Sequence, residues 1–205
     1  MEQSILESYN TVLLRGEMME LPAFSHENHG KRFDRFTLEV QRLSGARDLI
    51  PVIAEHGLLS ELDPTSGDMI EVEGQLRSYN NRSGEGRRLV ITVYANRVDF
   101  TDGEPDNRVF LQGRICREPV YRRTPLGREI CDVMLAVERK YGKADYLPCI
   151  LWGSLARMAA DCQKGTVMWL QGRIQSRTYM KQLETGCEER TAFEVSAITA
   201  DVELD

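Results

Sequence analysis

The sequence predicts an all-β chain built as two successive five-stranded barrels. Two observations support this prediction. Long stretches of the first half recur in the second half at nearly constant spacing, which is typical of a duplicated module. Within each copy, short runs alternate apolar and polar residues with the period of two that characterises a half-buried β-strand.

The repeat is clearest at the start of each copy. Asn10–Gly16 (NTVLLRG) matches Asn107–Gly113 (NRVFLQG) 97 residues later, and Leu38–Arg42 matches Leu135–Arg139 at the same spacing. Later matches are spaced by 98 residues, which indicates a one-residue insertion. The sequence therefore predicts two modules, residues 1–100 and 106–205. The short polar linker Thr101–Pro105 leaves them little independent motion, so they should pack together or onto a second copy of the chain.

In the first copy the pattern predicts three strands, a short helix and two more strands. The expected strands are Asn10–Leu21, Arg32–Arg42, Asp48–Ala54, Asp68–Arg77 and Arg88–Val98, with the helix at Gly57–Leu62 and loops at Pro22–Lys31 and Asn80–Arg87. Gly16 lies inside the first strand. A glycine there often marks the bend that a small closed barrel needs at its corners.

The second copy repeats this series. The expected strands are Asn107–Arg117, Arg128–Val137, Asp145–Trp152, Thr166–Arg177 and Thr191–Ala200, with a helix at Ser154–Gln163 and a turn at Thr124–Gly127. A helix between the third and fourth of five strands fits the OB-fold, a five-stranded Greek-key barrel.

Bulk properties exclude several classes of protein. No apolar run is long enough to cross a membrane, and the acidic, polar N-terminus is not a secretory signal, so a cytoplasmic location is expected. The five cysteines are odd in number and lack a Cys-x-x-Cys motif, which indicates reduced thiols. His26 and His29 are not accompanied by a full ligand set, so neither a metal nor a cofactor is predicted. No catalytic constellation is present, and we expect no enzyme activity.

The net charge of −6 is unevenly distributed. Residues 1–105 carry 11 basic and 18 acidic side chains, a net charge of −7, whereas residues 106–205 carry 15 and 14, a net charge of +1. Local charge matters more than total charge for contact with a phosphate backbone. Of the two modules, the second is therefore the better candidate for binding nucleic acid.

Residues 107–176 contain many short motifs in a fixed order. They include Gly113-Arg114, Glu118-Pro119, Thr124-Pro125, Leu135-Ala136-Val137, Trp152-Gly153, Lys164-Gly165 and Gly172-Arg173-Ile174-Gln175. This series resembles the bacterial single-stranded DNA-binding protein family. The resemblance implies an OB-fold that binds single-stranded DNA without catalysis. It also implies a role in DNA replication, recombination or repair.

A sequence-tolerant binder of single strands needs flat aromatic faces and cations along a groove. The second copy offers four rings: Tyr141, Tyr146, Trp152 and Tyr179. Tyr146 and Trp152 are six residues apart on one strand, so they should share a face. The resemblance implies that these rings stack on bases. Trp169, between Met168 and Leu170, is instead expected in the core or at a subunit interface.

Basic residues are interleaved with these rings. We expect contacts to phosphates from Arg114, Arg122, Arg139, Lys143, Arg173 and Arg177, with Arg123, Arg128, Lys140 and Lys181 as further cations. The first copy lacks the rings: Ser44, Leu49 and Glu55 stand where the second has Tyr141, Tyr146 and Trp152. A structural role is favoured for the first barrel, although Phe33, Arg32 and Arg35 could form a weaker site.

Three further expectations concern partners. Typical members of the resembled family assemble four OB-folds, so two modules per chain indicate a homodimer. Such members also carry a tail with an acidic tip that recruits other proteins. Here the sequence ends at Asp205 directly after the last expected strand, so recruitment by such a tail is not expected. Two alternatives stay open: a primosomal-type OB protein that acts mainly through protein contacts, and an RNA-binding OB module.

Overall fold

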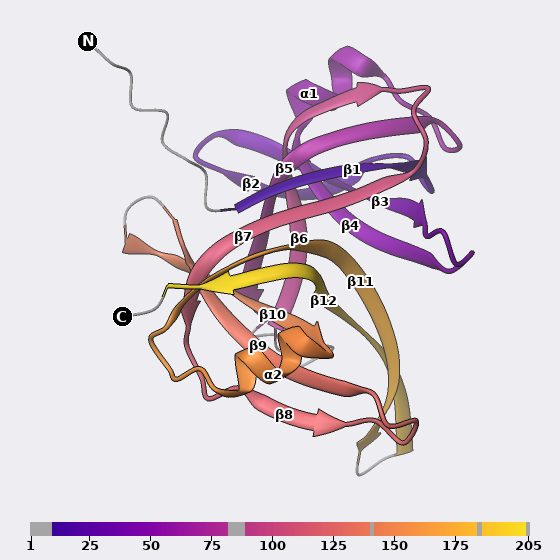
Figure 1. Cartoon of the computed structure of the whole chain (residues 1–205). Coiled ribbons are helices and arrows are strands. Elements are labelled where there is room, and N and C mark those ends of the chain that lie inside the picture. The colour runs from indigo at the N-terminus through magenta and orange to yellow at the C-terminus, as the bar shows by residue number, and fades with distance from the viewer. Residues whose placement is uncertain (1–9, 82–88, 140–141, 184–185, 204–205) are drawn as a thin grey trace.

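The computed structural model describes residues 10–81, 89–139, 142–183 and 186–203. The described chain is mostly β-structure, with two short helices (Figure 1). The strands of the first half are β1 (Asn10–Met18), β2 (Ala23–Asn28), β3 (Lys31–Gln41), β4 (Arg47–Glu55), β5 (Met69–Asn80) and β6 (Leu89–Phe100), with helix α1 (His56–Leu62) after β4.

The second half repeats this order. Its strands are β7 (Asp106–Ile115), β8 (Val120–Arg123), β9 (Glu129–Glu138), β10 (Ala144–Trp152), β11 (Val167–Leu183) and β12 (Gly186–Val202), with helix α2 (Ser154–Ala160) after β10. The one-residue insertion falls at Gly153, because Trp152 corresponds to Glu55 while Ser154 corresponds to His56. Gly153 has a positive φ of 56°, which glycine adopts without strain.

Each half closes into a barrel by the same pairings. In the first barrel β1 pairs with both β5 and β3, β5 pairs with β6, and β6 runs parallel to β4. The second barrel has the equivalent pairings of β7, β11, β12, β10 and β9. The two tandem OB-fold barrels predicted from the sequence agree with this topology.

Glycines at the barrel corners allow this closure. A Cβ atom at Gly16 would lie 2.2 Å from the carbonyl oxygen of Glu39, and one at Gly113 would lie 2.6 Å from that of Ala136. Both distances are far below van der Waals contact, so only glycine fits where the first strand of each barrel crosses its partner.

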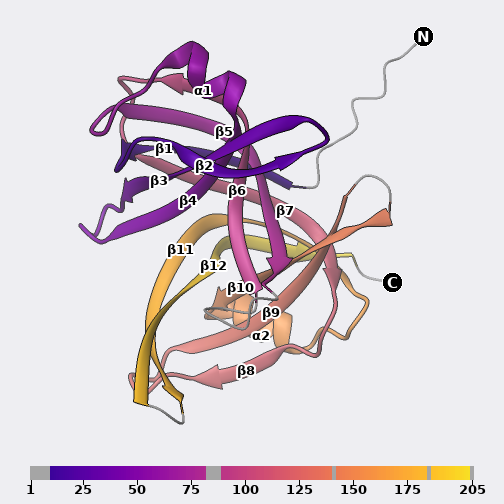
Figure 2. The same ribbon diagram turned by 180° about the vertical axis from the view of Figure 1, so that it is seen from behind.

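The two barrels share one continuous sheet. Strand β1 pairs antiparallel with β7 from Asn10 opposite Leu111 to Arg15 opposite Asp106. In Figures 1 and 2 the barrels accordingly lie one above the other, with β1 and β7 adjacent at their junction. The interior of each barrel is lined by alternate apolar residues of its strands, such as Leu14 and Val72 in the first and Leu111 and Leu147 in the second.

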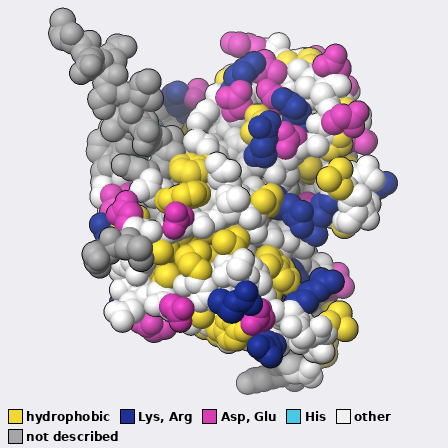
Figure 3. Space-filling view, viewed as in Figure 1, with side chains coloured by type: hydrophobic (Ala, Val, Ile, Leu, Met, Phe, Trp, Pro, Cys, Tyr) yellow, Lys and Arg dark blue, Asp and Glu magenta, His cyan; other side chains and the backbone are white. Residues whose placement is uncertain are grey.

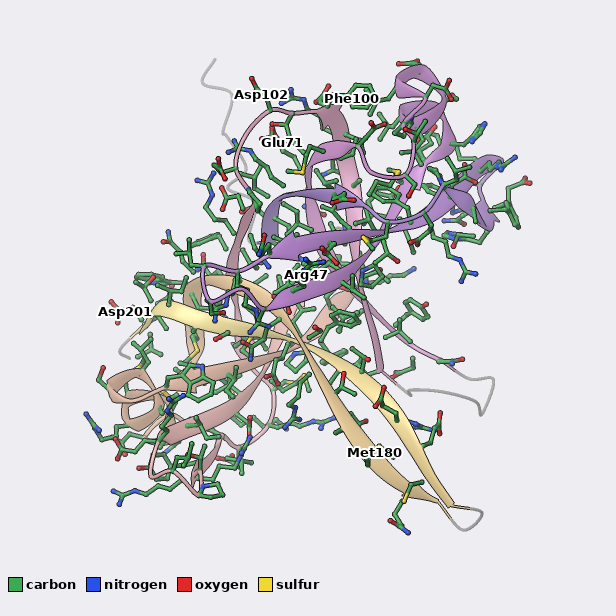
Figure 4. The ribbon with its side chains drawn as sticks, turned by 90° about the vertical axis from the view of Figure 1, so that its right-hand side faces the viewer. Arg47, Glu71, Phe100, Asp102, Met180 and Asp201 are labelled. Carbon is green, nitrogen blue, oxygen red and sulfur yellow. The ribbon has the colours of Figure 1, made fainter. Side chains whose placement is uncertain are left out.

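The structure differs from the sequence expectations at several local features. Residues 22–31 form β2 and a turn instead of a loop, and β8 was not predicted. Helix α2 ends at Ala160 instead of continuing to Gln163. Strands β11 and β12 are each 17 residues long and extend as a hairpin away from both barrels, with Met180 towards its tip (Figure 4).

Candidate nucleic-acid interface

Strand β10 presents Tyr146 and Trp152 on the outside of the second barrel. Its alternate residues Leu147, Cys149 and Leu151 are buried in the core. Tyr146 is 49% exposed. Trp152 is half-buried, and its indole Nε1 donates a hydrogen bond to Ser196 Oγ at 3.1 Å. The two rings therefore share the outer face of one strand, and neither is a core residue.

Trp152 lines an open depression at the end of β10. The end of β8 contributes Arg123 to the same depression, the turn before β9 contributes Arg128, and the start of β9 contributes Glu129. Arg128 is exposed, and Arg123 Nη2 lies 3.4 Å from a carboxylate oxygen of Glu129. A ring with two guanidinium groups beside it is the arrangement that accepts a base and its phosphate.

Glu129 organises the cations around this depression. Tyr121 Oη donates a hydrogen bond to its carboxylate at 2.6 Å, and Arg157 from α2 pairs with the same group. The Tyr121 hydroxyl and then the two arginines, Arg157 and Arg123, hold the pKa of Glu129 below its ordinary value. Glu129 stays ionised and fixes the arginines in place. Tyr121 was not predicted as part of this site, because β8 is too short and too exposed to show a strand pattern.

Tyr179 and Arg177 lie together on the long β11–β12 hairpin. They are two residues apart on β11, and the Arg177 guanidinium carbon is 6.0 Å from the centroid of the Tyr179 ring. This distance is within the range of a cation–π contact. Tyr179 was expected at the start of a loop, but β11 continues past it and carries both side chains.

The predicted cations differ in how they are held. Arg139 is 27% exposed; its Nε donates to Asp145 Oδ2 at 2.5 Å and its Nη2 donates to the carbonyl of Ser78 in the first barrel at 3.0 Å. Arg122 Nε lies 2.7 Å from Asp132, and Arg114 Nη1 donates to the carbonyl of Gly165 at 3.2 Å. Arg139 therefore lies at the junction of the barrels, and its contact with a phosphate stays a prediction.

The other predicted residues differ in exposure, and some lie outside the described part of the chain. Lys143 is exposed next to the start of β10, and Arg173 is half-buried on β11. Among the described residues the Nε atom of Arg173 is buried and has no hydrogen-bond partner. Tyr141 and Lys140 lie outside the described residues, as does the side chain of Lys181. The structure thus places Tyr146, Trp152 and Tyr179 on outer surfaces of the second barrel, and their role in binding stays a prediction.

The first barrel presents different side chains at the corresponding places. Leu49, the counterpart of Tyr146, is 48% exposed. Glu55, the counterpart of Trp152, forms an ion pair with Lys31 at 2.8 Å. Ser44, the counterpart of Tyr141, lies in the turn between β3 and β4. An aliphatic chain and a carboxylate therefore occupy the positions of the two rings of β10.

Aromatic residues of the first barrel gather elsewhere. The ring of His26 on β2 stacks on Phe33 with centroids 5.0 Å apart, and Phe33 lies 5.7 Å from the ring of Tyr94. Phe33 itself is buried, so it supports this cluster and offers no free face. Arg32 lies over the exposed ring of Phe24 at 5.6 Å. Tyr94 was not singled out from the sequence, and His26 was considered there only as a metal ligand, because the cluster depends on contacts among β2, β3 and β6.

Among the described residues, no group of three or more His, Cys, Asp or Glu side chains is arranged to hold a metal ion. Across the same part of the chain, neither helix is long and apolar enough to span a bilayer.

The outer face of the shared sheet is partly apolar. Leu13, Phe110 and Trp169 point outward from β1, β7 and β11 and are half-buried, and Ile198 on β12 is 65% exposed. Figure 3 shows hydrophobic side chains gathered over β7 and β12 on this face, with charged groups around them. Leu13, Phe110 and Ile198 line one open depression, which has Arg108 and Glu73 at its border.

Comparisons with known proteins agree with this geometry. The model of the family described as "Single-strand binding protein family" matches residues 106–203, the second barrel. Single-stranded DNA-binding protein B of Bacillus subtilis is 40% identical over 80 residues, which is 36% of this chain and 71% of that protein. A single-stranded DNA-binding protein of Clostridium tetani is 38% identical over 80 residues, 36% of this chain and 55% of that protein, so this match spans about half of the relative.

A solved structure extends the similarity to both barrels. The wild-type single-stranded DNA-binding protein of Thermus aquaticus superposes with a TM-score of 0.78 at 22% identity. The match covers 96% of this chain and 93% of that chain. The tandem arrangement of barrels is therefore shared with a known protein fold.

Proposed function

The chain belongs to the single-strand binding protein family, and from this we propose that it binds single-stranded DNA with little sequence preference, mainly through the second barrel. The family is one of binding proteins rather than enzymes. We assign binding mainly to the second barrel because Tyr146 and Trp152 face outward on β10. The first barrel has Leu49 and Glu55 at these positions. We further propose that this binding serves DNA replication, recombination or repair.

The chemistry of the second barrel suits this ligand. Unpaired bases expose flat faces that stack on aromatic rings, and each such stack contributes roughly 1–3 kcal/mol. Trp152 has Arg123 and Arg128 beside it, and Tyr179 has Arg177, so ring and cation occur together at two places. We propose that bases stack on these rings while the backbone phosphates contact the adjacent guanidinium groups.

Fluorescence titration with oligo(dT) tests the proposal, because the chain has two tryptophans, Trp152 and Trp169. In a Trp169→Phe variant the remaining signal comes from Trp152, and we expect it to be quenched on binding. In the matched Trp152→Phe variant the signal comes from Trp169, and we expect little change. Quenching confined to Trp169 would contradict the assignment of the site.

Salt dependence and competition complete this test. The logarithm of the affinity should fall with the logarithm of the salt concentration at a slope of about −0.7 for each phosphate contacted. Competition with an oligoribonucleotide of matched sequence measures the preference for DNA over RNA. Absence of binding at low salt would exclude the proposed function.

We also propose that two chains associate through the outer face of the shared sheet, giving four OB-folds. Phe110 lines the depression on this face, where burial of apolar area would favour association. Arg108 and Glu73 at the border could pair with groups of opposite sign on a second copy. Sedimentation should give twice the mass of one chain, and Phe110→Asp should give a monomer. A matched Leu43→Asp variant, which alters an exposed residue in the β3–β4 turn, should remain dimeric.

A cytoplasmic location is proposed with this function, since the relatives named above are bacterial proteins and bacterial DNA lies in the cytoplasm.

A further inference from the structure

Two buried aspartates cross the boundary between the barrels in opposite directions. Asp48 lies on β4 of the first barrel and Asp145 lies on β10 of the second, at equivalent positions of the repeat. Both are completely buried. Each accepts a hydrogen bond from the backbone of the other barrel, so the contact is reciprocal.

Asp145 binds strand β5 of the first barrel. Its Oδ1 accepts a hydrogen bond from the backbone N–H of Ser78 at 2.5 Å, and Arg77 Nη1 donates to its Oδ2 at 3.1 Å. The Ser78 hydroxyl oxygen in turn accepts a hydrogen bond from the backbone N–H of Tyr146 at 2.7 Å. The residue that carries one predicted stacking ring is thus bonded directly to the first barrel.

Asp48 makes the equivalent contact with strand β11 of the second barrel. Its Oδ1 accepts hydrogen bonds from the backbone N–H of Ser176 at 2.8 Å and from the Ser176 hydroxyl at 3.1 Å. Arg42 donates to the two carboxylate oxygens through Nε and Nη2, both at 2.5 Å. Ser176 immediately precedes Arg177 and lies three residues before Tyr179, so this bond fixes the base of the second predicted binding segment.

The ionised state of Asp48 strengthens its hydrogen bonds with Ser176. Burial raises the pKa of Asp48, but hydrogen bonds from Arg42 and from the Ser176 backbone outweigh burial and lower it below its ordinary value. The carboxylate is therefore ionised at neutral pH. Hydrogen bonds to an ionised acceptor are shorter and stronger than those between neutral groups.

Resting on the proposed function, we propose that the first barrel orients the two DNA-binding segments of the second barrel through Asp48, which holds Ser176, and through Ser78, which holds Tyr146. Both are positioning residues, because neither is placed to touch the DNA itself. This gives the first barrel a role in binding that does not require rings of its own. A side chain that stacks on a base must be held in place before the base arrives, and misplacement by about 1 Å is costly at a preorganised site.

The test compares Asp48→Ala with Asp34→Ala. Asp34 is an equally suitable buried carboxylate of the first barrel: it is 2% exposed and accepts hydrogen bonds from His56 Nδ1 at 2.5 Å and Arg32 Nε at 2.9 Å. Among the described residues, its hydrogen-bond and ion-pair partners both belong to the first barrel. Both variants remove one negative charge, so long-range electrostatics alone would tighten the binding of DNA in both.

We expect Asp48→Ala to weaken oligo(dT) binding roughly tenfold, about the effect of losing one stacked base, with an unchanged salt slope because no phosphate contact is lost. Asp34→Ala should bind as the wild type or slightly more tightly. Asp48→Asn, which keeps an oxygen acceptor for Ser176, should restore part of the affinity. Equal affinities of Asp48→Ala and Asp34→Ala would overturn the proposal, as would tighter binding by Asp48→Ala.

Hydrogen exchange separates this proposal from the proposed function. In the absence of DNA, Asp48→Ala should accelerate exchange of the backbone amides of residues 176–179, whereas Asp34→Ala should leave them unchanged. If wild-type protein fails to bind oligo(dT), the proposed function fails, and exchange at these amides still decides whether Asp48 holds the segment. If Asp48→Ala does not fold, Ser176→Ala, which removes only the hydroxyl contact, should weaken binding about two- to threefold, and no change would contradict the proposal.

Discussion

The two barrels share a backbone and differ in the side chains that this backbone presents. Leu49 and Tyr146 occupy equivalent positions and are exposed to nearly the same extent, 48% and 49%. The fold therefore sets where a side chain points, and the sequence sets what it can bind. Glycines with no room for a Cβ atom occur at matching places in both barrels, for example Gly74 and Gly172. The core positions keep the barrel closed, whereas the outer positions are free to diverge.

The largest expected effect comes from giving the second barrel the surface of the first. A double variant, Tyr146→Leu with Trp152→Glu, should lose roughly 2–6 kcal/mol of binding free energy for oligo(dT), because two stacks of about 1–3 kcal/mol each are removed. Fluorescence anisotropy of a labelled oligonucleotide measures this loss. The reciprocal variant, Leu49→Tyr with Glu55→Trp, is the matched control. Unchanged affinity in the first variant would show that the rings of β10 do not bind bases.

The glycines test whether the two barrels depend equally on close strand crossing. Gly74→Ala and Gly172→Ala would each bring a Cβ atom within 2.2 or 2.3 Å of a backbone carbonyl oxygen. Each should destabilise the protein by about 1–3 kcal/mol, as expected for overpacking that forces the backbone to move. Urea unfolding followed by circular dichroism measures the change. Gly127→Ala, at a turn position with open space around it, tests only the cost of its positive φ and should cost less.

Acid should weaken the contacts of the buried carboxylates of the first barrel. Burial raises the pKa of Asp34 in the first barrel, but hydrogen bonds from His56 and Arg32 bring the net value below the ordinary one, and Asp48 is likewise lowered. Because their folded-state pKa values lie below the unfolded values, their contribution to stability is fully present above about pH 4 and is lost as the pH falls through the folded values. Unfolding free energies between pH 6 and pH 3 should therefore decline less steeply in Asp34→Asn than in the wild type. Equal slopes would contradict the assignment.

Thiol reactivity is the smallest expected effect and concerns the second barrel alone, which carries all five cysteines. Burial raises the pKa of Cys131 to about 11 and raises that of Cys149 further, and only the thiolate reacts with a disulfide reagent. Cys187 on β12 is exposed. At pH 8 we expect Cys187 to react first and Cys131 and Cys149 to react only after unfolding. Mass mapping of the labelled peptides gives the order, and early labelling of Cys149 would show that the barrel opens readily.

Much of the fold could be predicted because its signals are local or repeated. The alternation of apolar and polar residues identified the barrel strands. The repeat helped further, because a strand with a weak pattern in one copy could be compared with its counterpart in the other. Strands β2 and β8 were missed because nearly all of their residues are exposed, so no apolar face marks them, and pairing with β3 and β9 alone holds them in place.

The candidate site was only partly predictable for a similar reason. The even spacing of Tyr146 and Trp152 gave their shared face from the sequence. The position of Arg139 could not be predicted from the sequence, because its partner Ser78 is 61 residues distant in the chain and belongs to the other barrel. The ring cluster of His26, Phe33 and Tyr94 likewise depends on contacts among β2, β3 and β6.

The order of strands in the continuous sheet also limits edge-to-edge aggregation of the protein. In the described part of the chain, β2 and β8 are the two edge strands of this sheet. They are six and four residues long and carry charged side chains such as Glu27, Arg122 and Arg123. Short charged edge strands are poor templates for another strand. Concentrated solutions of this protein should therefore resist growth into fibrils, even though the described residues form a sheet of twelve strands.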